Sequence, residues 1–145
     1  MIPELIDIGS IWKALPPGLH DASLDEVELV FVTDAHRRKL FEGLKSGCAA
    51  LKKAGCITVY LDGSYVTEKT DPGDFDACWD PTGVDPALLD SVLLDFANRR
   101  QNQKLKYQGE FFPSTWLADG ARTFVDYFQI DKDSGSKKGL LVIRL

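Results

Sequence analysis

The chain has 145 residues, of which 44% are hydrophobic and 27% charged, and its formal net charge is −5. This length suits one domain with a substantial core, and no apolar run approaches the ~20 residues of a membrane span. The N-terminal residues lack the basic start and apolar centre of a signal peptide. The negative net charge argues against a general nucleic-acid binder, although a local basic patch could still bind RNA or a nucleotide. The three cysteines contain no Cys-x-x-Cys and are odd in number. We therefore expect buried, reduced thiols in a cytoplasmic protein without a membrane partner.

An irregular arm and a short helix are predicted at the start of the chain. Residues 1–20 contain several prolines and glycines, so this arm is expected to lack regular secondary structure and to pack onto the rest of the domain. Ser23, with Glu26 three residues later, is a capping-box pattern that predicts a short helix. We therefore divide the chain into an N-terminal arm with its short helix, residues 1–32, and a domain, residues 33–145.

A longer helix and a buried strand come next. Thr33 or Asp34 can cap the helix, and apolar residues recur at three- and four-residue steps, as in a helix with one buried face. Gly55 is typical of a helix end. The apolar run over residues 56–61 then predicts a buried strand.

The second half of the chain predicts a helix and three further strands. Asp85 and Pro86 form a typical helix start, and residues 99–106 form a basic, amide-rich bridge. Apolar strands are predicted over residues 107–112, 124–129 and 139–145. Helices before and between strands indicate the α/β (α+β) class, with a mixed sheet and flanking helices in a single small domain.

Two polar motifs flank the connection after the buried strand. Gly63-Ser64 ends that strand, and Asp74-Phe75-Asp76 opens the next apolar segment. Side chains two apart in a strand share a face, so Asp74 and Asp76 should project side by side, where a hard divalent cation would relieve their repulsion. Gly63 would let a phosphate approach the backbone, and Ser64 could bind its oxygens. The plain alternatives are a tight turn and a solvated acidic turn.

At these residues the sequence resembles the nucleotidyltransferase superfamily, which includes DNA polymerase beta and the small bacterial minimal nucleotidyltransferases. The superfamily has Gly-Ser after a strand, a connection with a short helix, and Asp-x-Asp on the next strand. Gly63-Ser64 and Asp74-x-Asp76 match in kind and spacing. Two wider phrases, Leu15–His20 and Leu61–Thr67, are similar to a bacterial and phage group of nucleotidyltransferase-like proteins of unknown function. The resemblance implies a nucleotidyltransferase-like mixed sheet.

The resemblance also implies a catalytic metal site for Mg²⁺ (or Mn²⁺). Asp74 and Asp76 would be metal ligands, together with a third carboxylate on a neighbouring strand. Asp126 lies between apolar neighbours and matches the superfamily's third motif better than the alternative, Glu110. A charge in such an apolar run is costly to bury unless a cation accompanies it. We therefore expect Asp74, Asp76 and Asp126 to be the catalytic carboxylates.

The implied reaction moves a nucleotidyl group from an NTP, such as ATP, to a hydroxyl acceptor. Gly63, Ser64 and Lys69 are the expected nucleotide-binding residues, with Lys69 in the connection between the two motifs. The expected kinds of acceptor are an RNA 3′ end, a protein hydroxyl or a small molecule.

A catalytically inactive binding module is the alternative function. Superfamily enzymes usually carry an extra helical domain for base or acceptor recognition, and this chain shows none. Minimal nucleotidyltransferases resemble partners in toxin–antitoxin pairs, so the alternative includes a toxin–antitoxin or phage-defence component bound to one protein partner. A plain α/β domain with a chance motif is a third alternative, and it would leave Asp74, Asp76 and Asp126 scattered.

Overall fold

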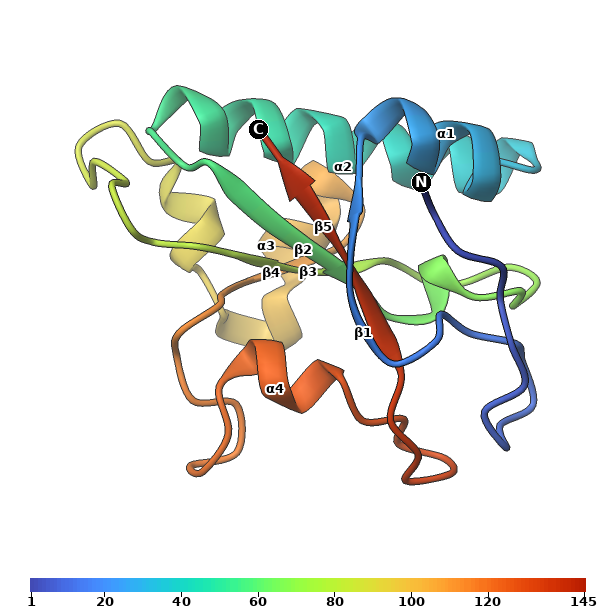
Figure 1. The fold of residues 1–145 in the computed structure, drawn as a ribbon. Coiled ribbons are helices and arrows are strands. Elements are labelled where there is room, and N and C mark those ends of the chain that lie inside the picture. Colours follow the sequence, from blue (N-terminus) through green and yellow to red (C-terminus); the bar gives the residue numbers. More distant parts are fainter.

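The computed structural model describes residues 1–145 and contains a five-stranded mixed sheet with helices against its two faces (Figure 1). The strand order is β1-β5-β2-β3-β4. The strands are β1 (Gly18–Ala22), β2 (Thr58–Asp62), β3 (Asp76–Trp79), β4 (Glu110–Pro113) and β5 (Gly139–Arg144). β2 runs antiparallel to both of its neighbours, whereas β1 pairs parallel with β5 and β3 pairs parallel with β4. The predicted α/β class with a mixed sheet is confirmed.

Helices α1 (Leu24–Phe31) and α2 (Ala35–Lys53) lie across one face of the sheet, and α4 (Phe124–Phe128) lies below the other (Figure 1). Helix α3 (Ala97–Tyr107) packs against α2 and β4. The capping box at Ser23 forms as predicted, since its side chain accepts from the Glu26 amide. Asp34 caps α2 by accepting from the Arg37 amide at 2.7 Å. None of the helices is both long enough and apolar enough to cross a lipid bilayer.

Alternation along the strands divides the apolar core into two clusters. The larger cluster includes Val59, Leu61, Ala77, Phe111 and Leu141 and packs with α1 and α2. A smaller cluster on the opposite face gathers Cys78, Phe112, Leu140 and, from α4, Phe128. Because side chains two apart in a strand share a face, Asp62, Asp76 and Glu110 point toward the α4 side of the sheet.

Three predicted elements are wrong. Residues 124–129 form helix α4 instead of a strand, because Thr123 caps them through the Asp126 amide. The helix predicted from Asp85 is replaced by turns and a short 3₁₀ helix, Ser91–Leu94. The predicted basic bridge, residues 99–106, is largely part of helix α3. This helix continues to Tyr107, so the strand predicted from residue 107 begins at Glu110.

The first turn of α3 has unusual backbone geometry and kinks the helix. Asn98, Arg99 and Arg100 are left-handed, with φ of 50°, 55° and 60°. Non-glycine residues adopt this conformation only at a cost in free energy. The turn places the Arg100 guanidinium against Glu110, with Nε 3.1 Å from a carboxylate oxygen.

Candidate functional site

Three carboxylates lie in a row across adjacent strands at one end of the sheet. Asp62 ends β2 and is the register partner of Asp76, which begins β3. Asp76 is in turn the register partner of Glu110, which begins β4. Directly paired residues place their side chains on the same face within contact distance of each other. The row therefore concentrates negative charge on the α4 side of the sheet, with Asp74 just before it in the chain.

Gly63 connects this row to the turn that leaves β2. Its φ is +82°, and a Cβ atom placed there would lie 2.5 Å from the Asp76 Oδ2 atom. Only glycine fits both the backbone angle and the carboxylate beside it. Ser64 begins a 3₁₀ turn immediately afterwards. The Gly-Ser motif and the second aspartate of the Asp-x-Asp motif are therefore in direct contact.

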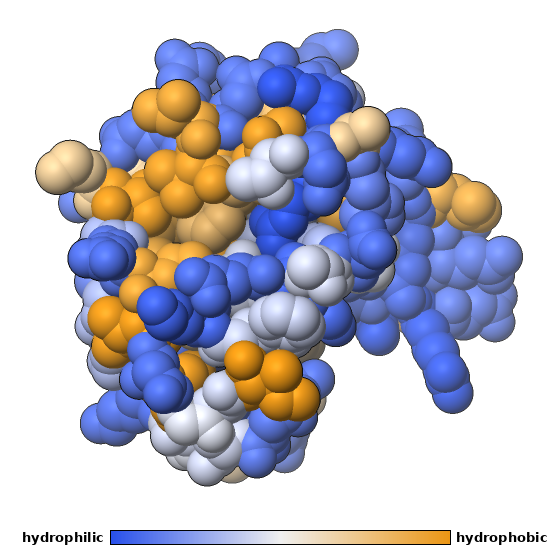
Figure 2. Space-filling model, turned by 90° about the vertical axis from the view of Figure 1, so that its right-hand side faces the viewer, coloured by the Kyte–Doolittle hydropathy of each residue, from blue (hydrophilic) through white to orange (hydrophobic).

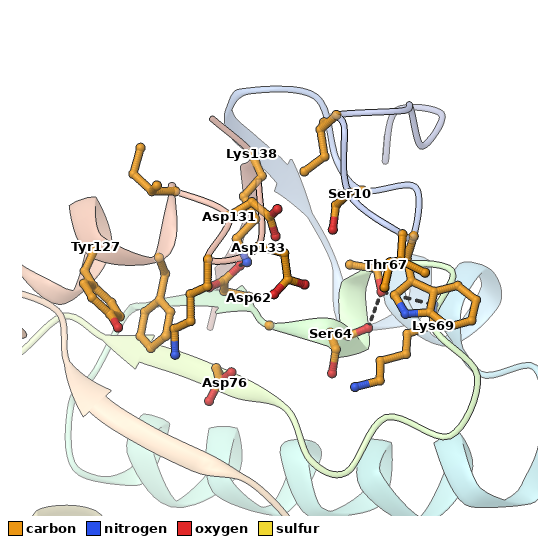
Figure 3. A pocket seen from close by; sticks show the side chains of 18 residues that line it. Ser10, Asp62, Ser64, Thr67, Lys69, Asp76, Tyr127, Asp131, Asp133 and Lys138 are labelled. Atoms are coloured by element: carbon orange, nitrogen blue, oxygen red, sulfur yellow. Dashed lines mark hydrogen bonds and ion pairs between the residues drawn. The ribbon is translucent and has the colours of Figure 1, made fainter. Parts of the chain in front are cut away.

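A cavity of about 450 Å³ opens beside this contact. Its lining includes four of the residues that the sequence singles out, Gly63, Ser64, Lys69 and Asp76. Figure 3 shows Ser64, Lys69 and Asp76 pointing into the same space. The structure thus brings the predicted nucleotide-binding residues and one predicted metal ligand into a single cavity.

Asp74 lies in a second cavity, which shares a wall with the first. This cavity, of about 460 Å³, is lined by Asp74, Asp76, Arg100 and Glu110, together with aromatic side chains. Asp76 therefore faces both spaces. A group held at Asp76 would contact ligands in either cavity.

Asp62 is a buried carboxylate that the sequence interpretation did not select. It is 1% exposed, and neither of its carboxylate oxygens accepts a hydrogen bond. Lys138 is its cationic neighbour, with Nζ 3.5 Å from Oδ1 (Figure 3). Burial raises the pKa of Asp62 to about 6, and Lys138 only partly offsets this effect. Its position just before Gly63, on the same face as Tyr60, is the signal that could have revealed it.

The pKa values of the other three carboxylates shift in different directions, upward for Asp76 and Asp74 and downward for Glu110. Burial, followed by Glu110 and the other aspartates, raises the pKa of Asp76 well above its usual range. Burial alone would raise the pKa of Glu110, but a hydrogen bond from Asp76 and ion pairs with Lys104 and Arg100 lower it. Both cations lie 3.1 Å from the same Glu110 oxygen. Burial and Glu110 also raise the pKa of Asp74.

Asp126 lies apart from this cluster. It is exposed on α4 and lines a different pocket with Arg122, Gln129 and Lys138. The structure brings Glu110, the alternative third carboxylate, to Asp76 and leaves Asp126 outside both cavities. The expected placement of Asp126 on a strand beside Asp74 and Asp76 is therefore corrected by the helical geometry of α4.

The carboxylate cluster offers the kind of ligand atom that a hard divalent cation prefers, but its side chains are not positioned to bind one. Its side chains offer only carboxylate oxygens, which Mg²⁺ prefers. As they lie, no three histidine, cysteine, aspartate or glutamate side chains are close enough to hold one metal ion. Arg100 and Lys104 already pair with Glu110, so a metal at Asp76 would require these side chains to rearrange.

A buried arginine fixes the segment that carries Lys69. Arg37 of α2 donates to the carbonyl oxygens of Tyr65, Thr67 and Lys69 at 2.6, 3.0 and 2.8 Å. The guanidinium is buried, and it also donates to the Phe31 carbonyl at 3.2 Å. Because one planar group holds several carbonyls, the backbone at Lys69 is tied to α2.

Replacing Asp62 with asparagine should raise the free energy of unfolding at neutral pH by about 1–2 kcal/mol. The pKa of Asp62 is about 6 in the folded protein and 3.8 for an ordinary aspartate, so protonation of Asp62 favours the folded state, with its full effect below about pH 4. That contribution is lost as the pH rises through 6, whereas the neutral amide loses nothing. In urea unfolding without divalent cations, the free energy of unfolding of Asp62→Asn should exceed that of the wild type at pH 8, and the difference should decrease toward pH 4. A gain equal at both pH values would contradict this account of the Asp62 environment.

The chain is thus a small α/β domain with two adjoining cavities at one end of its sheet. Carboxylates line these cavities, and arginine and lysine side chains pair with some of them. The chain belongs to a family of unknown function, DUF6932, whose sequence model matches residues 10–144. Neither the curated proteins nor the solved structures contain a significant match to the chain. The family match includes every strand of the sheet, the lining of the second cavity and, except for Ile8, the lining of the first.

Proposed function

We propose that the chain is a Mg²⁺-dependent nucleotidyltransferase that moves a nucleoside monophosphate group from an NTP to a hydroxyl acceptor. The observation that carries this proposal is the contact between Gly63 and the Asp76 carboxylate, beside a cavity that also contains Ser64 and Lys69. A phosphate-binding turn and a potential metal ligand are thereby adjacent, as nucleotidyl transfer requires.

Each residue has a distinct part in the proposed reaction. The Ser64 hydroxyl donates to a phosphate oxygen, and Lys69 neutralises phosphate charge from the same side of the cavity. Asp76, with Asp74 and Glu110 beside it, would hold a Mg²⁺ ion that neutralises charge on the phosphates. The acceptor oxygen bonds to the α-phosphorus, pyrophosphate leaves, and the hydroxyl proton passes to a cleft carboxylate. An RNA 3′ end and a protein hydroxyl remain the proposed acceptors.

The experiment uses NTPs labelled at either the α or the γ phosphate, with Mg²⁺ and either RNA or cell lysate. Transfer of the α label without the γ label is the expected result. Ser64→Ala and Glu110→Gln should lower the transfer, whereas Asp126→Asn should not. If no NTP gives transfer and calorimetry detects no Mg²⁺-dependent NTP binding, the proposal fails.

One observation favours a catalytically inactive binding module as the second candidate. Glu110 is already neutralised by Arg100 and Lys104, as in a structural ion pair. In that case the domain would act through a protein partner, such as the other member of a toxin–antitoxin pair. Affinity purification should then recover a stoichiometric partner, and Asp74→Ala should leave its association unchanged. Loss of association in Asp74→Ala would count against this candidate.

A further inference from the structure

The N-terminal arm forms one wall of the cavity that contains Ser64 and Asp76 (Figure 3). Residues 8–14 contribute five lining residues, namely Ile8, Ser10, Ile11, Trp12 and Ala14. Four of these side chains are apolar, whereas Asp62, Lys132 and Lys138 belong to the polar lining. The cavity therefore has a charged part and an apolar part, and different segments of the chain supply them.

Backbone hydrogen bonds close the arm into a loop. Ile6 and Ala14 exchange two hydrogen bonds of 2.8 and 2.9 Å. Ala14 also forms a bridge with Thr67, and the Glu68 amide donates to the Lys13 carbonyl at 3.1 Å. The base of the loop is thus joined to the segment that carries Lys69, so the apolar wall and the proposed phosphate site are held together.

The tip of the loop contacts the turn on the other side of the cavity. A Cβ atom at Gly9 would lie 3.9 Å from the Ser134 Cβ atom. Burial alone would raise the pKa of Asp131, but hydrogen bonds from Ser134 and Ser10 lower it. Figure 3 shows Ser10 and Asp131 near each other, where the arm meets this turn. The arm is therefore supported at its base and at its tip.

The apolar wall is accessible from solvent. Ile11 is 82% exposed, and Ile8 and Trp12 are partly exposed, although all three are large apolar side chains. Figure 2 views the side of the molecule that carries the arm, and apolar side chains gather there on one half of the face. A flat apolar ligand would remove this surface from water, which favours binding.

We infer that the N-terminal arm is the nucleobase-binding element of the cavity, with the planar base placed against Trp12, Ile8 and Ile11. This inference depends on the proposed function, because it concerns the same nucleotide whose phosphates lie at Ser64 and Lys69. An indole offers a large flat face on which any base can stack. A cavity of about 450 Å³ is within the range of small-molecule sites.

The experiment compares nucleoside triphosphates with inorganic tripolyphosphate, which carries the phosphates without a base. With Mg²⁺ present, calorimetry should show that the wild-type protein binds NTPs at least about ten-fold more tightly than tripolyphosphate. Trp12→Ala should lower NTP affinity by about ten-fold and leave tripolyphosphate affinity unchanged. Trp12→Phe, which keeps an aromatic face, should recover most of the NTP affinity.

Trp116→Ala provides the matched control. Trp116 is 50% exposed and lies outside the cavity, so the same chemical change there should alter neither affinity. Equal wild-type affinities for NTP and tripolyphosphate, or an unchanged NTP affinity in Trp12→Ala, would overturn the inference and leave the proposed function standing. Binding of neither ligand would overturn both.

Discussion

Replacing Asp76 with asparagine is expected to lower nucleotidyl transfer by about 10²–10³-fold, the scale on which removal of one preorganised charge-stabilising group lowers a rate. Asp76 contacts Gly63 and lines both cavities, so no other carboxylate can take its place. The amide has nearly the same shape, which keeps the contact with Gly63. The transfer assay with α-labelled NTP measures the loss.

Stability should change in the opposite direction in the same variant. Burial and the neighbouring carboxylates disfavour the ionised form of Asp76, so the neutral amide should raise the free energy of unfolding. Sites that hold charge for function commonly lower stability in this way. Asp126→Asn is the control, because Asp126 is exposed and lies outside both cavities. Full transfer activity in Asp76→Asn would remove Asp76 from the proposed site.

Replacing Gly63 with alanine is expected to lower the free energy of unfolding by about 2–4 kcal/mol. Two effects add at this position. The backbone angle of +82° is unfavourable for alanine, and its Cβ would lie 2.5 Å from the Asp76 carboxylate. Relief requires the β2–β3 junction to shift, because Asp76 is paired within the sheet and Gly63 directly follows its pairing partner, Asp62. Urea unfolding at neutral pH measures the change.

Gly120 offers a closely matched control for the backbone effect alone. Its φ is +81°, and a Cβ atom there would meet nothing within 4 Å. Gly120→Ala should therefore lower the free energy of unfolding by only about 1 kcal/mol. The difference between the two variants measures the contact with Asp76. Equal losses in both would show that the carboxylate moves away freely.

Local capping and strand signals predicted most of the first half of the fold. Ser23 and Asp34 are caps that act within three residues, so their effect is visible in the sequence. The Gly-Ser and Asp-x-Asp motifs mark the two ends of one connection, and antiparallel pairing of β2 with β3 brings those ends together. The cavity residues Gly63, Ser64, Lys69 and Asp76 were predictable for this reason.

Predictions in the second half failed where local bonds or distant packing decide the structure. Asp85, Asp90 and Asp95 each accept a hydrogen bond from the amide two residues later, and these turns interrupt the predicted helix. Residues 124–128 have strand-like composition, yet Phe124 and Phe128 both pack against Phe112 as a helical pair. Asp126 was therefore assigned to a strand that does not exist.

Pairing between strands explains the remaining part of the site. Glu110 becomes a neighbour of Asp76 only because β4 adds parallel to β3, and nothing in the intervening segment indicates this register. Asp62 lies in a row with both only because β2 and β3 align residue by residue. Such alignment follows from the whole sheet, so a single sequence could not show it.

The position of β5 has a consequence for how the chain folds. β5 lies between β1 and β2, so the strand formed by residues 139–144 is needed to join the sheet's first strand to the rest. Its pairing of Gly18 with Gly139 joins residues that are far apart in the chain, and contacts of such long sequence separation slow folding. During folding, β1 would remain unattached to the sheet until β5 forms, because β5 is the strand with which it pairs. We therefore expect the cavity, whose lining includes Lys138 directly before β5, to be completed late in folding.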